Sequence, residues 1–175
     1  MLPPEGYALD FDGANDYVTA PNHPSLEITG DLTVELWFNA DEINATSRLV
    51  QFGAQGETEA TNTLYLLYLD TSGDVVMLHE NGAGVNNEVT FSTNLPVEEW
   101  HHLAISRDAA AKTYTLYVDG ASIGTKTYAN NPTGGGDAIL WIARDQSGSL
   151  FLTAQSTMCE SGTWSAVRPT SPPVI

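Results

Sequence analysis

Short runs of β-branched, aromatic and aliphatic residues recur at intervals of about ten residues along this chain, and turn-forming residues separate them. Runs that alternate between apolar and polar side chains are typical of half-buried strands. We therefore expect an all-β chain of 175 residues with two antiparallel sheets packed as a sandwich, and almost no helix. The best predicted strands are Tyr7–Phe11, Leu32–Asn39, Arg48–Phe52, Thr63–Asp70, Val75–Glu80, Asn86–Ser92, Trp100–Asp108, Thr113–Asp119 and Ala138–Ala143.

Two hairpins are predicted from the chemistry of their turns. Gly73 lies between the runs 64–69 and 75–79, and glycine readily adopts the positive φ that tight turns require. Asp119-Gly120 is a favoured two-residue turn, after which Ile123–Tyr128 returns as the second strand of the hairpin. We expect one continuous domain over residues 7–151, after a linker or fragment start at residues 1–6.

The charge of the chain narrows the choice of partners. There are 22 acidic residues against 6 lysines and arginines, a formal net charge of -16, so nucleic acid and anionic membrane surfaces are poor partners. No apolar run is long enough for membrane insertion, and no signal peptide is visible at the start. If the protein is exported, the signal belongs to an upstream part of a longer chain. The single cysteine, Cys159, excludes an internal disulfide.

Five blocks of the sequence follow one another in a distinctive order and spacing: Leu9–Val18, Leu32–Phe38, Trp100–Arg107, Tyr114–Gly120 and Leu140–Asp145. Together they resemble the laminin-G-like jelly-roll family within the concanavalin A-like lectin and glucanase superfamily, over residues 7–151. Ala143 stands where this family usually has glycine. The resemblance implies a concanavalin A-like sandwich.

Function follows less directly, because this superfamily includes lectins, adhesion modules, carbohydrate-binding modules and some glycosidases. We expect a non-catalytic module that binds a carbohydrate or glycoprotein, within a larger multidomain protein that is extracellular or at the cell surface. A structural or adhesion spacer without a small ligand is the alternative, and a glycosidase is the third candidate.

A glycosidase would need two carboxylates that face each other across a groove. In the jelly-roll glucanases that this sequence resembles, such a pair lies in a Glu-x-Asp-x-x-Glu-like run, which is absent here. Glu35 stands alone, and Glu57 with Glu59 lies in a loop-like stretch. His101 and His102 are adjacent in a predicted strand, so their rings point to opposite faces and cannot share a ligand. We predict that the protein is not an enzyme.

Calcium is the cofactor that the sequence suggests. Asp12, Asn15 and Asp16 surround a glycine turn, and calcium prefers carboxylate, amide and backbone oxygens. Many members of the resembled family bind one calcium at the rim of the sandwich. The same residues also suit a turn that holds no metal, and the acidic composition also suits solubility, so both interpretations stay open.

Exposed aromatic side chains could form a platform for sugar rings. Strand patterns place three tryptophans in the predicted core: Trp37, Trp100 and Trp141. The surface candidates are Tyr65, Tyr68 and Tyr117. Because positions 65 and 68 differ by an odd number, one of these two side chains must face away from the other.

The composition changes after Phe151. Residues 152–175 are rich in serine, threonine and proline, and the family's closing strand, resembling Phe-x-Gly-x-Ile-Asp-Asp-Val-Arg-Ile-Trp-Asn, is missing. The coding sequence of residues 151–163 can also be read in a shifted frame, in which each new codon combines the third base of one codon with the first two bases of the next. With a suitable choice of codons, this frame encodes Ser-Asp-Gly-Ser-Ile-Asp-Asp-Val-Arg-Ile-Trp-Asn-Val. A one-base frameshift near residues 148–151 explains this, and a genuine linker is the alternative. We expect an irregular tail, a sandwich without its closing C-terminal strand, and poor stability.

Overall fold

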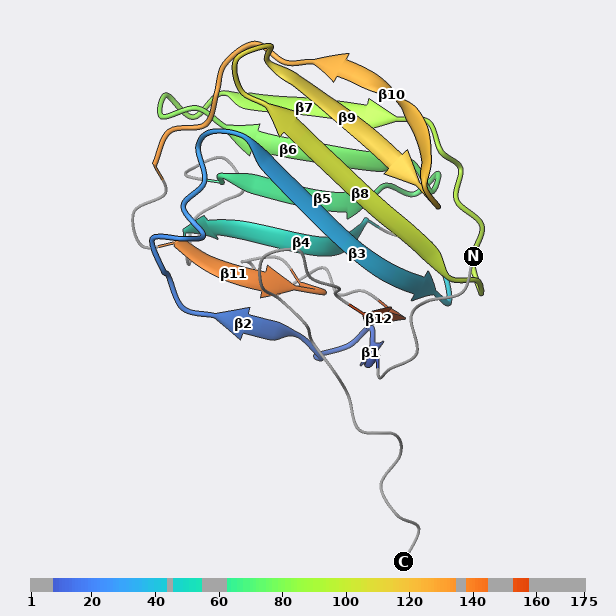
Figure 1. Cartoon of the computed structure of the whole chain (residues 1–175). Helices are drawn as coiled ribbons and strands as arrows, with labels where there is room; N and C mark the ends of the chain where they lie inside the picture. Colours follow the sequence, from blue (N-terminus) through green and yellow to red (C-terminus); the bar gives the residue numbers. More distant parts are fainter. Residues whose placement is uncertain (1–7, 44–45, 55–62, 135–137, 145–152, 158–175) are drawn as a thin grey trace, which may run out of the picture.

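The computed structural model describes residues 8–43, 46–54, 63–134, 138–144 and 153–157. In these residues the chain forms two antiparallel sheets of six strands each, packed face to face (Figure 1). This arrangement confirms the predicted all-β, two-sheet sandwich. The described part of the chain contains no helix that is long and apolar enough to cross a membrane.

Sheet A has the strand order β1-β12-β3-β8-β9-β10, with bounds β1 Leu9–Asp12, β12 Thr153–Thr157, β3 Leu32–Ala40, β8 His101–Asp108, β9 Thr113–Val118 and β10 Ala121–Thr127. Sheet B has the order β2-β11-β4-β5-β6-β7, with bounds β2 Val18–Ala20, β11 Ala138–Ile142, β4 Ser47–Ala54, β5 Tyr65–Leu69, β6 Val75–Glu80 and β7 Asn86–Phe91. The short strand β2 was not foreseen. It lies at the edge of sheet B, next to β11.

Both hairpins predicted from their turns are present. Asp119 and Gly120 have φ values of 50° and 79°, the two positive angles of a type I′ turn between β9 and β10. At the β5–β6 turn the Asp70 carboxylate accepts hydrogen bonds from the backbone N–H groups of Ser72 and Asp74, at 2.8 and 3.0 Å. Gly73 in the same turn has a φ of 75°.

The core fills the space between the two sheets. In sheet A the burial of β8 and β9 alternates along the strand, as expected when one face packs on the core and the other faces solvent. Sheet B differs, because all six residues of β6 are buried. Leu66, Val76 and Leu78 are buried without belonging to the core cluster, whereas Leu67 and Met77 beside them belong to it. Sheet B is therefore buried on parts of both faces.

A buried arginine connects the segment that precedes β3 in sheet A with the segment that precedes β5 in sheet B. The Arg107 side chain in β8 donates hydrogen bonds to the backbone carbonyls of Ile28 at 2.6 Å, Gly30 at 2.8 Å and Leu64 at 3.3 Å. Only 2% of Arg107 is exposed. A buried charge is tolerated when hydrogen bonds replace its hydration, and these three carbonyls supply them.

The C-terminal part of the sandwich corrects one prediction. β12 pairs with β1 on one side and with β3 on the other, so Ser156 lies opposite both Leu9 and Phe38. Residues 153–157 thus form a strand, although an irregular tail was expected over residues 152–175. The prediction that the family's own closing strand is missing stays a prediction. The low hydrophobicity of Thr-Ala-Gln-Ser-Thr suggested a linker, but ladder hydrogen bonds need only the backbone, and threonine favours strands. Residues 158–175 lie outside the described residues, and the frameshift stays a prediction.

Candidate ligand-binding site

The outer face of sheet B, which points away from the core, carries the candidate site. Strand alternation places Leu140 and Ile142 of β11 in the core cluster and turns Ile139 and Trp141 to the opposite face. In the neighbouring strand β4 the residue opposite Trp141 is Gln51. Trp141 is 6% exposed and Gln51 is fully buried. Trp141 is buried as predicted, but it lies outside the cluster between the two sheets, on the opposite face of β11.

A pocket of about 320 Å³ opens on this face, at the edge formed by β2 and β11. Its volume is at the lower end of the range for small-molecule sites. Its lining residues are Tyr17, Thr19, Pro21, Ile139 and Trp141. Tyr17 is 44% exposed and its ring lies 5.9 Å from that of Trp141, tilted by 50°. The pocket therefore has two aromatic walls, one of them open to solvent.

A change in backbone conformation brings a cation to the pocket. Ala143 has a φ of 64°, which is uncommon for a residue other than glycine, and it is fully buried in the core cluster. Ile142 and Ala143 thus both face the core, and the alternation of β11 is broken. The Arg144 guanidinium consequently lies over the outer face, 4.2 Å from the ring centroid of Tyr17 and 5.1 Å from that of Trp141. Both distances are within cation–π range.

Three buried polar atoms near the pocket have no hydrogen-bond partner among the described residues. Among the described residues, neither Nε2 nor Oε1 of Gln51 has a partner, and neither has the indole Nε1 of Trp141. Buried polar atoms without partners are uncommon in folded proteins and call for an explanation. The indole donor and the amide donor and acceptor lie on neighbouring strands, and all three atoms are shielded from solvent.

Farther along the same face, Tyr68 belongs to a separate cluster. Its hydroxyl donates to Glu88 Oε2 at 3.0 Å, and the guanidinium of Arg48 lies 4.7 Å from its ring centroid. Burial, reinforced by the negative charge of Glu88, raises the pKa of Tyr68 to about 12. Burial also raises the pKa of Glu80, whose Oε2 accepts a hydrogen bond from the Thr63 N–H at 3.0 Å.

The three tyrosines that were predicted as surface candidates lie in three different parts of the sandwich. Tyr65 stacks on Phe52 in the core and is 4% exposed, so its prediction as a surface residue is wrong. Tyr68 faces the other way, which confirms that these two side chains oppose each other. Tyr117 is 38% exposed on the outer face of sheet A. Trp37 is buried as predicted, but it lies outside the cluster between the sheets and packs against His102 on that same outer face.

The predicted calcium residues form a turn that leads directly into the pocket wall at Tyr17. Asp12 Oδ1 accepts hydrogen bonds from the backbone N–H groups of Ala14 at 2.8 Å and Asn15 at 3.2 Å, and these bonds lower the pKa of Asp12. Asp16 Oδ2 accepts the Asp12 N–H at 3.2 Å. These are the contacts of a turn, and calcium binding at Asp12, Asn15 and Asp16 stays a prediction.

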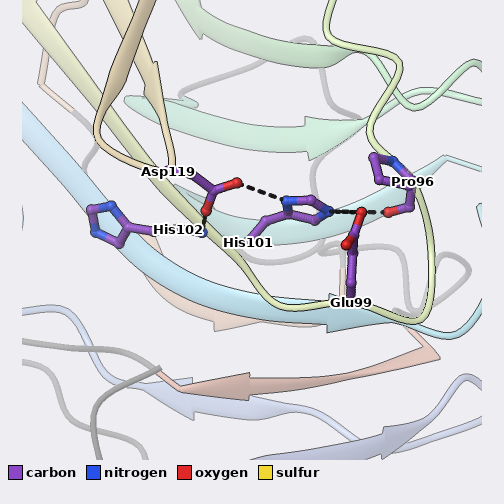
Figure 2. A network of polar contacts seen from close by, with 5 residues as sticks. All are labelled: Pro96, Glu99, His101, His102 and Asp119. Atoms are coloured by element: carbon purple, nitrogen blue, oxygen red, sulfur yellow. Dashed lines mark hydrogen bonds and ion pairs between the residues drawn. The ribbon is translucent and has the colours of Figure 1, made fainter. Parts of the chain in front are cut away.

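The adjacent histidines point to opposite faces, as predicted (Figure 2). His101 is buried, with Nδ1 3.1 Å from Asp119 Oδ2 and Nε2 3.3 Å from the Pro96 carbonyl oxygen. His102 lies on the outer face of sheet A, where its Nε2 is 3.1 Å from Glu35 Oε1. Both histidines thus have structural partners. Glu57 and Glu59 lie outside the described residues.

Comparisons with known proteins agree with this architecture. A family model described as Concanavalin A-like lectin/glucanases superfamily matches residues 12–165, beyond the boundary expected at residue 151. A curated relative from Rattus norvegicus, "Sushi, von Willebrand factor type A, EGF and pentraxin domain-containing protein 1", is 24% identical over 156 residues. The match covers 87% of this chain but only 4% of that relative's length.

Several solved structures share the fold at low sequence identity. The carbohydrate-binding module CBM40 of the Ruminococcus gnavus IT-sialidase, bound to α2,3-sialyllactose, has a TM-score of 0.65 at 13% identity, covering 89% of this chain and 92% of that one. Domains LG4-5 of the mouse laminin α1 chain have a TM-score of 0.65 at 16% identity, covering 89% of this chain and 42% of that one. A putative carbohydrate-binding protein from Bacteroides ovatus has a TM-score of 0.60 at 15% identity, covering 88% of this chain and 43% of that one.

Proposed function

This chain belongs to the concanavalin A-like lectin/glucanases superfamily, and from that membership and its pocket we propose that it is a non-catalytic carbohydrate-binding module. Its ligand is a saccharide, free or on a glycoprotein, bound on the outer face of sheet B. The module belongs to a larger extracellular or cell-surface protein. The much longer relative and the fold shared with a carbohydrate-binding module support this proposal.

The observation that carries the proposal is the pair of aromatic walls, Tyr17 and Trp141, around one pocket. Sugar rings have apolar faces that pack on aromatic rings, and their hydroxyls need hydrogen-bond partners at the edge. Thr19 also lines the pocket, and its hydroxyl can both donate and accept a hydrogen bond. Ligand pockets combine apolar surface with a few polar groups in this way.

The test begins with a glycan array, followed by calorimetric titration of the best saccharide. Tyr17→Ala should weaken binding at least about fivefold, since an aromatic contact contributes about 1 kcal/mol. Tyr117→Ala is the matched control, because it removes an equally exposed tyrosine from the opposite sheet: 38% exposed against 44% for Tyr17. Equal effects of the two substitutions would contradict the pocket.

Two alternatives give different outcomes in the same experiments. A structural or adhesion spacer predicts a uniformly blank array. A glycosidase predicts release of reducing sugar from a bound polysaccharide, and loss of that release in Glu80→Gln or Glu88→Gln, the two carboxylates on β6 and β7 of the same face. We expect binding without release.

A further inference from the structure

We propose that the pocket selects an N-acetylated sugar, with the sugar ring on Tyr17 and Trp141 and the methyl group of its acetamido substituent against Ile139 and Pro21. This inference rests on the proposed function, since it names the class of saccharide that the same pocket takes. It starts from the order in which the lining residues follow one another along β2 and β11. Among the described residues that line the pocket none carries a charge, so its lining suits a neutral ligand.

Alternation in and around β2 places three lining residues on one face. Tyr17, Thr19 and Pro21 are exposed, whereas Val18 is half-buried and Ala20 is buried between them. Side chains two positions apart point to the same side of a strand, so the three exposed residues lie in a row on the outer face. All three line the pocket. Their order is an aromatic ring, a hydroxyl and an aliphatic ring.

The neighbouring strand β11 continues the same order. Trp141 is the cross-strand partner of Thr19 in an antiparallel pair (Figure 1). The residue two positions before Trp141 therefore lies opposite the residue two positions after Thr19, so Ile139 faces Pro21. The pocket thus has two aromatic residues at one end, a threonine in the middle and two aliphatic residues at the other end.

The spacing along the strands fits an acetamido group. Residues on one face of a strand are about 6.6 Å apart, because each residue advances the chain by about 3.3 Å. A trans amide holds its two flanking carbons about 3.8 Å apart. The methyl carbon of an acetamido group therefore lies that far beyond the ring carbon that carries it, which is itself displaced from the centre of the sugar ring. With the sugar ring on Trp141, the methyl group reaches Ile139.

Each part of the acetamido group meets a side chain of matching chemistry. The amide passes the Thr19 hydroxyl, which can accept a hydrogen bond from its N–H or donate one to its carbonyl oxygen. The methyl group packs on the aliphatic surface of Ile139 and Pro21. A sugar with a hydroxyl at the same position has no methyl group to bury there, and the two aliphatic side chains offer a hydroxyl no hydrogen bond.

Charged substituents fit this end of the pocket less well. An ammonium group on the sugar is attracted at long range by the formal net charge of -16, but it loses hydration against the aliphatic side chains without gaining a partner from them. A carboxylate loses its hydration in the same way and is also repelled by the net charge. An amino sugar without its acetyl group therefore separates the effect of charge from that of the acetyl group.

The test compares two series of methyl glycosides by NMR titration. One series is glucose, glucosamine and N-acetylglucosamine; the other is galactose, galactosamine and N-acetylgalactosamine. In at least one series the acetylated sugar should bind about tenfold more tightly than the other two, because the buried methyl group and the hydrogen bond each raise the affinity several-fold. Saturation transferred from the protein should be strongest at the acetyl methyl protons.

Two substitutions test the two halves of the contact. Ile139→Thr keeps a β-branched shape but makes the aliphatic end polar, and Thr19→Val keeps the shape of the side chain but removes the hydroxyl. Each should lower the preference for the acetylated sugar to about threefold or less. Thr125→Val is the matched control, because it changes another exposed threonine on an edge strand, β10 of the opposite sheet, and should leave the preference unchanged. Unchanged thermal midpoints would show that the variants fold.

Several results would overturn the inference and leave the proposed function standing. These are equal binding of the acetylated and hydroxyl sugars in both series, equally tight binding of the amino sugar, saturation transfer that is weak at the methyl protons, or an unchanged preference in both variants. Failure of all six sugars to bind, while the glycan array identifies another saccharide, would also overturn the inference alone. Failure of all six together with a blank array would contradict the proposed function as well.

Discussion

Acidification should destabilise this domain through one buried histidine. His79 is fully buried, its Nε2 lies 2.6 Å from the Asn130 carbonyl oxygen, and its Nδ1 lies 2.7 Å from the Tyr114 hydroxyl. A neutral ring that donates from Nε2 and accepts at Nδ1 satisfies both contacts. Burial, with a smaller effect of the Arg107 charge, lowers the pKa of His79 to about 4.

The sign and size of the effect follow from proton linkage. The pKa of His79 is about 6.5 in the unfolded chain and about 4 in the folded one, so the unfolded state binds the proton first. Stability is therefore full above pH 6.5 and falls as the pH drops from about 6.5 to about 4. The loss is about 3 kcal/mol, because each tenfold weakening of proton binding corresponds to about 1.4 kcal/mol. A typical domain has only about 5 to 15 kcal/mol in total.

Urea unfolding followed by tryptophan fluorescence at pH 7, 6, 5 and 4 measures this loss. The control is His79→Gln, whose amide can donate to Asn130 and accept from Tyr114 but cannot titrate. It should lose about 3 kcal/mol less than the original protein between pH 7 and pH 4. Glu80 works in the opposite direction, because its raised pKa favours the folded state at low pH, and this contribution cancels in the comparison. Parallel pH profiles for the two proteins would refute the reasoning.

Three further outcomes are expected. Arg107→Met should lower the free energy of unfolding by about 3 kcal/mol or more, because it leaves three backbone carbonyls without their donors; a loss below about 1 kcal/mol in urea unfolding would contradict this role. Millimolar calcium should raise the thermal midpoint slightly, and Asp12→Asn should remove the increase; an unchanged midpoint in the original protein counts against the site. Restoring the shifted frame from residue 151 should raise the melting temperature, and coding DNA that does not spell Ile-Asp-Asp-Val-Arg-Ile-Trp in that frame ends the frameshift hypothesis.

The sequence predicted the sandwich and both hairpins because turn chemistry and alternation act locally. Asp119-Gly120 has the positive φ values that its residue types favour. Alternation shows which residues share a face but not which face is the core, when both faces are apolar. Trp141 is the example, since β11 has Leu140 and Ile142 on one face and Ile139 with Trp141 on the other. The site was missed for this reason.

Two further features depend on information that a local pattern does not contain. The sequence shows that Ala143 stands where the resembled family usually has glycine. It does not show that the backbone of Ala143 has a left-handed conformation, which places the Arg144 side chain on the outer face. β12 was missed because its pairing depends on open edges of β1 and β3, more than 100 residues away, rather than on its own hydrophobicity.

The pairing of β12 with β1 also determines how the module would be attached within a longer protein and how it would respond to tension. Leu9 and Ser156 are partners, so the first and the last described strands lie side by side in one ladder. Within a longer protein the module would hang from the main chain as a side arm. Tension along that chain would separate β1 from β12 one residue pair at a time, starting at Leu9, because the pull acts on the same end of both strands. Such a module yields to a small force at its point of attachment.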